Sequence, residues 1–190
     1  PYNILAITFT KKATNEMRER VSNIVGDKAK YINISTIHAL CAKILRMGIE
    51  AIGYSKDFEI IDDEDALKVL NEIYKEENID RKYFSPKAAL SIIGNYKIKD
   101  NIKLFALQEK IYNSYQKYLK EHNLVDFEDL LVLTKEVLLK DQKYLEYLQN
   151  KYQYILVDEF QDTNPIQYEI IKLLAGKKAN LFVVGDDDQS

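Results

Sequence analysis

Two adjacent carboxylates, Asp158 and Glu159, end one of the most apolar stretches of the chain, residues 154–157 of "QYILVDEFQDTN". An apolar strand that stops at charged side chains delivers them to the carboxyl edge of an α/β sheet, where ligands of such sheets bind. One carboxylate can hold Mg²⁺ there through water, while its neighbour accepts a proton from a water that attacks a phosphoryl group. Taken alone, the pair is explained equally well by a loop that faces solvent.

The segment "LFVVGDDDQS" repeats this arrangement near the end of the chain. An apolar run again leads into polar residues, here Gly185, Asp186, Asp187, Asp188 and Gln189. Two strands of a parallel sheet that both end in carboxylates converge on one site, which favours a functional interpretation. The neutral amide of Gln189 can hydrogen-bond a terminal phosphate or a lytic water without repelling it. An unrelated metal-binding loop is the alternative at this point.

The pattern of apolar residues predicts the elements that position these side chains. Short runs rich in apolar and β-branched residues predict strands buried on both faces, as in parallel sheets. A helical pattern follows the predicted strand at residues 154–160. In this pattern, Asn164 fits an N-cap, Pro165 the first helical position and Gly176 the end. Strands alternating with helices predict an α/β fold with a parallel sheet. The predicted strands are residues 4–10, 31–38, 154–160 and 181–186.

Residues 62–150 differ from both flanks, because they show almost only helical periodicity. Ser85 before Pro86 is a predicted helix start, and so is Asp126 with Asp129 behind it. An all-helical block between two parts of one sheet is most simply an insertion. We therefore predict a discontinuous α/β domain at 1–58 and 151–190, with a helical inserted subdomain at 59–150.

The composition limits the class of protein. A hydrophobic content of 46% over 190 residues can fill one generous domain or two small ones. The single cysteine, Cys41, cannot form an intramolecular disulfide, and His38 and His122 are too few for a structural zinc site, so a cytoplasmic location is expected. No run approaches the roughly 20 apolar residues of a membrane span, and no membrane partner is expected. A basic start and an acidic end suggest a polyanion and a metal ion as ligands.

Five segments, in matching order and spacing, resemble motifs of the UvrD/PcrA/Rep-like superfamily-one DNA helicases. "ILAITFTKKATNEMRERV" is similar to motif Ia, "ISTIHALCAKILR" to motif Ib, and "VDFEDLLVLT" to a further segment before motif II. "ILVDEFQDTN" and "VVGDDDQS" resemble motifs II and III. The resemblance covers essentially the whole chain and implies a partial RecA-like domain of the P-loop NTPase type, with the family's helical insertion.

This resemblance implies an activity and residue roles. In the family, the residues that match Asp158 and Glu159 bind Mg²⁺ and activate water, and the one that matches Gln189 senses the terminal phosphate of ATP. The implied protein is an ATP-dependent DNA helicase that translocates on single-stranded DNA from three-prime to five-prime and unwinds duplex DNA, with repair or replication proteins as partners. A helicase-nuclease subunit and a non-catalytic DNA-binding or scaffold protein of the same fold are the alternatives.

The first motif places hydroxyls, an aromatic ring and two lysines where a strand becomes a helix. Helix N-termini and lysines attract phosphate, and aromatic rings stack on bases. Taken singly, Phe9 is more often a core residue, the lysines a solvated helix start, and His38 a structural hydrogen-bonder. The resemblance implies that both early segments line a DNA channel. The predicted DNA-binding residues are Thr8, Phe9, Thr10, Lys11, Lys12, Thr36 and His38.

The chain departs from the family pattern at a few positions. Phe160 stands where Tyr is usual, and Lys11 and Thr14 replace the commoner Asn and Ala. In the second motif, Ile37 stands for Phe and Ala39 for Ser, which removes a ring and a hydroxyl near the DNA.

Two other patterns suggest function but have simpler explanations. Tyrosines recur at every third position over residues 112–118, which helix packing explains better than base stacking. Gly48 and Gly53 have the spacing of a phosphate-binding loop, but Tyr54 stands at the position of its lysine. The resemblance places the genuine loop upstream of residue 1, so we expect these 190 residues alone to hydrolyse no ATP.

Overall fold

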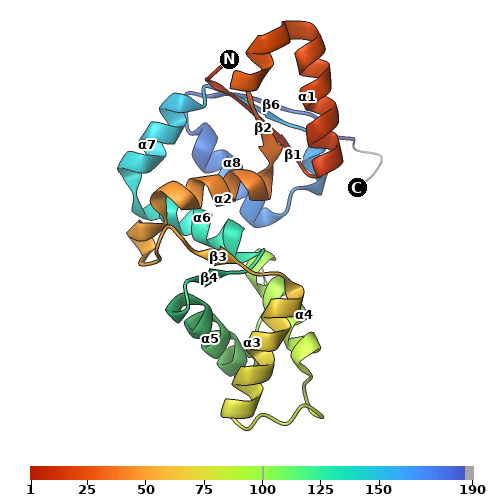
Figure 1. Ribbon diagram of the computed structural model, residues 1–190, viewed down its shortest axis with the longest axis vertical. Coiled ribbons are helices and arrows are strands. Elements are labelled where there is room, and N and C mark those ends of the chain that lie inside the picture. The colour runs from red at the N-terminus through yellow and green to blue at the C-terminus, as the bar shows by residue number, and fades with distance from the viewer. Residues whose placement is uncertain (100, 187–190) are drawn as a thin grey trace.

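A computed structural model describes residues 1–99 and 101–186, and it has a sheet-bearing part and a helical part (Figure 1). The sheet has four parallel strands in the order β2-β1-β5-β6. The α/β fold with a parallel sheet is therefore confirmed. Its strands are β1 (Ile4–Thr8), β2 (Asn33–Thr36), β5 (Tyr154–Val157) and β6 (Asn180–Val183).

The register aligns the carboxyl ends of all four strands at one edge. Thr8 of β1 pairs with Thr36 of β2, Ile7 with Val157 of β5, and Val157 with Val183 of β6. The residues that directly follow the strands therefore lie along the same edge of the sheet.

Five helices accompany the sheet, and most of them start at a capping side chain. Thr10, Thr36 and Asn164 each accept a hydrogen bond from the backbone amide three residues ahead. The predicted start and end of the last helix are confirmed, because Pro165 is its first residue and Gly176 follows it with a φ of 53°. These helices are α1 (Lys11–Val25), α2 (Ile37–Gly48), α6 (Asp129–Lys140), α7 (Gln142–Lys151) and α8 (Pro165–Ala175). Short 3-10 turns occur at η1 (Gly26–Tyr31), η2 (Ile49–Ile52) and η3 (Phe160–Asp162).

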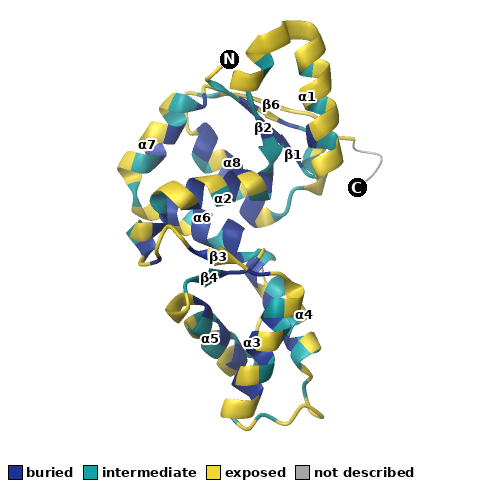
Figure 2. Cartoon of the chain, viewed as in Figure 1, coloured by how far each residue is buried: buried dark blue, intermediate teal, exposed yellow. Residues whose placement is uncertain are grey.

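The first hydrophobic core lies between the sheet and α2, α6, α7 and α8. Leu5, Ile7, Ile155 and Val157 are the fully buried residues that the four-stranded sheet contributes to it (Figure 2). The prediction that the strands are buried on both faces is wrong for β5 and β6. In β5 only alternate residues are buried, and all four residues of β6 are exposed, because β6 is the edge strand and no described element covers its outer side.

A second core fills the helical part of the molecule. It packs three helices against one another around Leu70, Tyr74 and Tyr115, all nearly or fully buried. Tyr115 lies inside this core and Tyr112 and Tyr118 pack against it, in agreement with the packing interpretation of the tyrosine repeat. Its helices are α3 (Asp63–Glu76), α4 (Pro86–Ile98) and α5 (Ala106–Glu121), and the two-residue strands β3 (Glu59–Ile60) and β4 (Leu124–Val125) lie beside them.

The helices α6 and α7 pack with the sheet, although the sequence pattern groups them with the helical block. Leu131, Val137, Leu145 and Leu148 belong to the first core, and α6 packs against α2 and α8. Helical periodicity cannot reveal which core a helix joins, because an apolar stripe fits either partner equally well. Within the described residues, no helix combines the length and apolarity that would let it cross a membrane.

A buried charge cluster joins the helical part to α6. The side chain of Lys97 in α4 is 1% exposed, and its Nζ lies 2.5 Å from Asp126 Oδ2 and 2.8 Å from Asp129 Oδ1. Tyr115 donates from its hydroxyl to Asp126 at 3.1 Å, and Asp126 caps the start of α6 by accepting from the Asp129 amide at 2.8 Å. Burial disfavours the ammonium, but the two carboxylates outweigh it and raise the pKa of Lys97. The cluster thus links α4, through Lys97, and α5, through Tyr115, to the start of α6.

Replacing Lys97 by Met should lower the free energy of unfolding by about 3–5 kcal/mol, because two buried carboxylates lose their counter-charge. Urea denaturation of both proteins measures this loss. Lys68→Met is the matched control, because Lys68 pairs with Asp65 at 2.6 Å but is 71% exposed, so it should cost about 0–1 kcal/mol. Equal losses in the two variants would contradict a structural role for the buried cluster.

The cluster also predicts a pH dependence of stability. Burial raises the pKa of Asp129 to about 6, despite the opposing effect of Lys97. A folded-state pKa above the unfolded value of about 4 means that the folded chain binds more protons between these pH values. Stability from this group is therefore lost as the pH rises from about 4 to 6. The free energy of unfolding of Asp129→Asn should fall less over this window than that of the wild type, and parallel pH profiles would refute the assignment.

Candidate functional site

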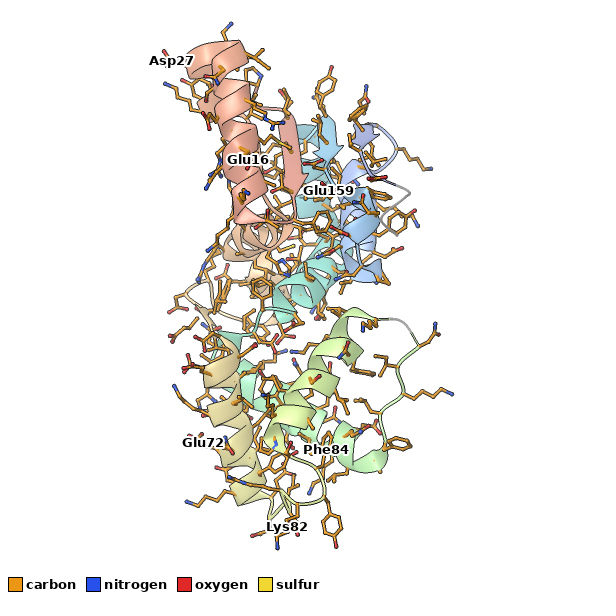
Figure 3. The ribbon with its side chains drawn as sticks, turned by 90° about the vertical axis from the view of Figure 1, so that its right-hand side faces the viewer. Glu16, Asp27, Glu72, Lys82, Phe84 and Glu159 are labelled. Carbon is orange, nitrogen blue, oxygen red and sulfur yellow. The ribbon has the colours of Figure 1, made fainter. Side chains whose placement is uncertain are left out.

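Asp158 and Glu159 lie directly after β5, in the turn where the chain leaves the sheet. The Asp158 amide donates to the Ile7 carbonyl at 3.0 Å, which extends the pairing of β5 with β1 by one residue. Glu159 has a left-handed backbone with a φ of 50°, which is uncommon for a residue other than glycine and concentrates at functional sites. The Glu159 side chain is exposed, and Figure 3 places it in the sheet-bearing part, far from Glu72, Lys82 and Phe84 at the opposite end of the molecule.

Gln161 connects this turn to the end of β6. Its Nε2 donates to Glu159 Oε2 at 2.6 Å, and its Oε1 accepts from the Asp186 amide at 3.1 Å. The Phe160 amide also donates to the Val184 carbonyl at 2.8 Å. Gly185 permits this approach, since a Cβ at that position would lie only 2.8 Å from Gln161 Oε1. The turn after β5 and the end of β6 therefore meet, as predicted from the sequence, and Gln161 joins Glu159 to Asp186.

Part of the predicted site lies outside the described residues. Asp187, Asp188 and Gln189 fall there, so the proposed phosphate contact of Gln189 stays a prediction. Gln161, whose amide holds the turn together, was missed by the sequence reasoning although it stands in the quoted "DEFQDTN" segment. The signal was available, because an amide two residues after paired carboxylates can orient one of them.

The donor set at this edge fits a magnesium–nucleotide ligand. Mg²⁺ is commonly held by one or two carboxylates together with water and substrate phosphates, and not by a full protein cage. Asp158 is partly exposed, and its Oδ1 accepts from the Glu159 amide at 3.2 Å, a long bond that a metal can displace. No cluster of three or more metal-ligating side chains occurs among residues 1–99 and 101–186, which is compatible with a site completed by phosphates.

The neighbouring half of the same edge is formed by the ends of β1 and β2. Two helices start there side by side, α1 after Thr10 and α2 after Thr36, so their unpaired amides and positive dipole ends occupy one surface. Lys11 and Lys12 are exposed in the first turn of α1, and Lys12 makes only a 4.0 Å contact with Glu16. This arrangement suits the phosphates of a nucleic acid strand.

Two of the predicted DNA-binding side chains have structural roles. Thr8 is fully buried, and its hydroxyl lies 2.6 Å from that of Thr14, so it holds the start of α1 and does not reach the surface. Thr14 is one of the departures from the family pattern, and this hydrogen bond accounts for its hydroxyl. Phe9 is partly buried against the first core, which limits the area that it can offer to a base.

His38 stacks on Phe127, a ring that the sequence reasoning did not select. Their ring centroids lie 3.9 Å apart at 20°, and Phe127 is 51% exposed. Burial lowers the pKa of His38 to about 4, so the imidazole is neutral at physiological pH and can donate a hydrogen bond but adds no charge. Phe127 follows β4, and only tertiary packing brings it to the start of α2. The exposed aromatic surface at this edge is therefore supplied by Phe127 more than by Phe9.

Comparison with known proteins agrees with this geometry. The model for the UvrD/REP helicase N-terminal domain matches residues 1–190. The chain is 45% identical over 202 aligned residues to the ATP-dependent DNA helicase PcrA of Staphylococcus aureus, and 44% identical over 200 to that of Staphylococcus epidermidis. Each alignment covers 100% of this chain but only 27% of the relative. Matching along its whole length, the chain belongs to the UvrD/REP helicase family and represents part of its RecA-like N-terminal domain.

Proposed function

We propose that the protein containing this chain is an ATP-dependent DNA helicase, in which the edge formed by β1, β2, β5 and β6 serves both ATP hydrolysis and DNA binding. The observation that carries the proposal is the shared edge itself. Carboxylates follow β5, and two helix N-termini with exposed lysines follow β1 and β2. The identity with PcrA helicases, whose name states an ATP-dependent activity on DNA, supports both assignments.

When bound at the proposed site, ATP would supply the phosphoryl group that is transferred to water, and Mg²⁺ would neutralise its charge. Asp158 would hold the metal, and Glu159 would accept the proton of the attacking water. Gln161 keeps the Glu159 carboxylate oriented through the 2.6 Å hydrogen bond. Gln189, which lies outside the described residues, is proposed to contact the terminal phosphate. The 190 residues contain no G-x-x-x-x-G-K-[ST] phosphate-binding sequence. Among the described strands, β6 pairs on one side only, with β5.

On the DNA side, the strand lies across the starts of α1 and α2. Phosphates contact Thr10, Lys11, Lys12 and Thr36, and a base stacks beside His38 on Phe127. We further propose movement from three-prime to five-prime, duplex unwinding and a role in repair or replication, and the relationship to the family supports these proposals. The division into a sheet-bearing domain and a helical insertion belongs to the same proposal, and the two separate cores support it.

Glu159→Gln in the complete protein should reduce DNA-stimulated ATP turnover by about 10²–10⁴-fold, because the amide cannot accept the proton. Nucleotide affinity should change little, since the side chain keeps its size and Asp158 is untouched. Steady-state turnover and equilibrium binding of a fluorescent ATP analogue measure the two effects.

Glu169→Gln is the control, because Glu169 lies on α8 and forms a partly exposed ion pair with Lys172 at 3.8 Å. It should retain full turnover. Persistence of normal turnover in Glu159→Gln would remove Glu159 as the base, and a wild-type protein without turnover would favour the non-catalytic scaffold.

Lys11→Ala and Phe127→Ala should weaken single-stranded DNA binding in different ways. Loss of one phosphate contact lowers the slope of log affinity against log salt by about 0.7. Loss of one stacked base costs about 1–3 kcal/mol and leaves the slope unchanged. Affinities for a thymidine oligonucleotide at several salt concentrations separate the two effects.

Two exposed residues far from this edge provide controls. Lys28→Ala, in η1, should keep both affinity and slope, and so should Phe105→Ala, which removes a ring that is 78% exposed in the helical part. Unchanged binding in Lys11→Ala and Phe127→Ala would exclude this edge as the DNA track.

A further inference from the structure

A cavity lies at the opposite end of the sheet from Asp158 and Glu159. Its volume is about 660 Å³, within the range of small-molecule sites. It is formed by the residues just before β1, by the start of β2, and by side chains from α1, η1, α2 and α7. Because the strands are parallel, this amino edge is separated from the proposed catalytic edge by the full length of the sheet.

The cavity is strongly cationic. Arg18, Lys30, Lys43 and Lys151 line it, and no aspartate or glutamate does. Within the described part of the chain, none of these four side chains has a carboxylate in ion-pair distance, whereas other lysines do. A concentration of four uncompensated charges in a chain of net charge −3 is not a consequence of composition. It favours a ligand that carries several negative charges.

Aromatic rings lie beside these charges. The rings of Tyr2 and Tyr31 are 4.7 Å apart at 36°, and the two residues are 62% and 41% exposed. Lys30 Nζ lies 5.1 Å from the Tyr31 ring, and a third exposed ring, Tyr147, lines the same cavity. Cations next to exposed aromatic rings match the two parts of a nucleotide, since phosphates pair with the former and bases stack on the latter.

The wall of the cavity is held by hydrogen bonds. Arg18 donates from Nη2 to the Ile34 carbonyl at 2.6 Å, which fixes its guanidinium against β2. Asn33 donates from Nδ2 to the hydroxyl of Tyr152 at 2.8 Å, and Tyr152 is 2% exposed. Asn3 donates to the Lys151 carbonyl at 3.1 Å, which ties the start of β1 to the end of α7. The guanidinium of Arg18 and the backbone that carries Lys151 are thus held in place, which lowers the entropic cost of binding.

We propose that this cavity binds a nucleotide, with its phosphates against Arg18, Lys30 and Lys151 and its base against Tyr2 and Tyr31. The site is separate from the catalytic edge, so it serves regulation or strand holding and not turnover. The same chemistry is offered by a free nucleoside diphosphate and by the phosphorylated end of a DNA strand.

Photolabelling of the complete protein tests the proposal and separates the two sources. One arm uses 8-azidoadenosine diphosphate, and the other uses a 5′-phosphorylated thymidine oligonucleotide with a photoreactive end. Labelled peptides are mapped by mass spectrometry, which distinguishes this cavity from the catalytic edge. Label on residues 29–34 or 144–152 in the first arm identifies a free nucleotide, and in the second arm a strand end.

The double variant Lys30→Glu/Lys151→Glu should lose this label by about tenfold or more, because charged hydrogen bonds are replaced by repulsion. Its DNA-stimulated ATP turnover should remain, which keeps the outcome independent of the catalytic proposal. Lys28→Glu/Lys143→Glu is the matched control, because these exposed lysines lie on the same two elements but do not line the cavity. Absence of label from both peptides in both arms, or equal labelling of the two double variants, would overturn the proposal.

Discussion

Parallel pairing of four strands is the constraint on which the other features depend. Because β1 is hydrogen-bonded to β2 on one side and to β5 on the other, the starts of α1 and α2 and the turn at Asp158 share one edge. The Asp158 amide bonds directly to Ile7, so the proposed catalytic turn and the first DNA segment are connected through one strand. The two halves of this edge are therefore joined directly by backbone hydrogen bonds.

The helical part is attached to this sheet by a junction that is charged and dry. Lys97, Asp126 and Asp129 are almost completely buried, and together they connect α4 to the start of α6. Such clusters contribute little net stability compared with apolar packing, but they penalise any alternative arrangement that leaves a charge unpaired. Phe127 sits in this same junction, between Asp126 and Asp129. The orientation of the helical part and the position of the stacking ring are thus set by the same few residues.

The strands of the sheet differ in how far they are buried. Leu5 and Ile7 of β1 lie in the first core, whereas β6 is exposed along its whole length, with Leu181 and Phe182 exposed by 44% and 58%. An exposed apolar edge strand is unfavourable in an isolated domain. The chain spans 27% of the length of the PcrA relatives. The cationic cavity lies at the amino end of the sheet and is independent of that edge.

The amino-acid sequence by itself determined the strands, the N-cap at Asn164 with Pro165 as the first helical residue, and the acidic strand ends, because periodicity, capping and turn chemistry are local. It also indicated the family, since ordered motifs carry that information without coordinates. Only the tertiary structure decided that α6 and α7 join the first core, that Thr8 is buried, and that Phe127 stacks on His38. These outcomes depend on contacts between residues far apart in the chain, and apolar or hydroxyl side chains have the same local pattern whether they finally face a core or a ligand.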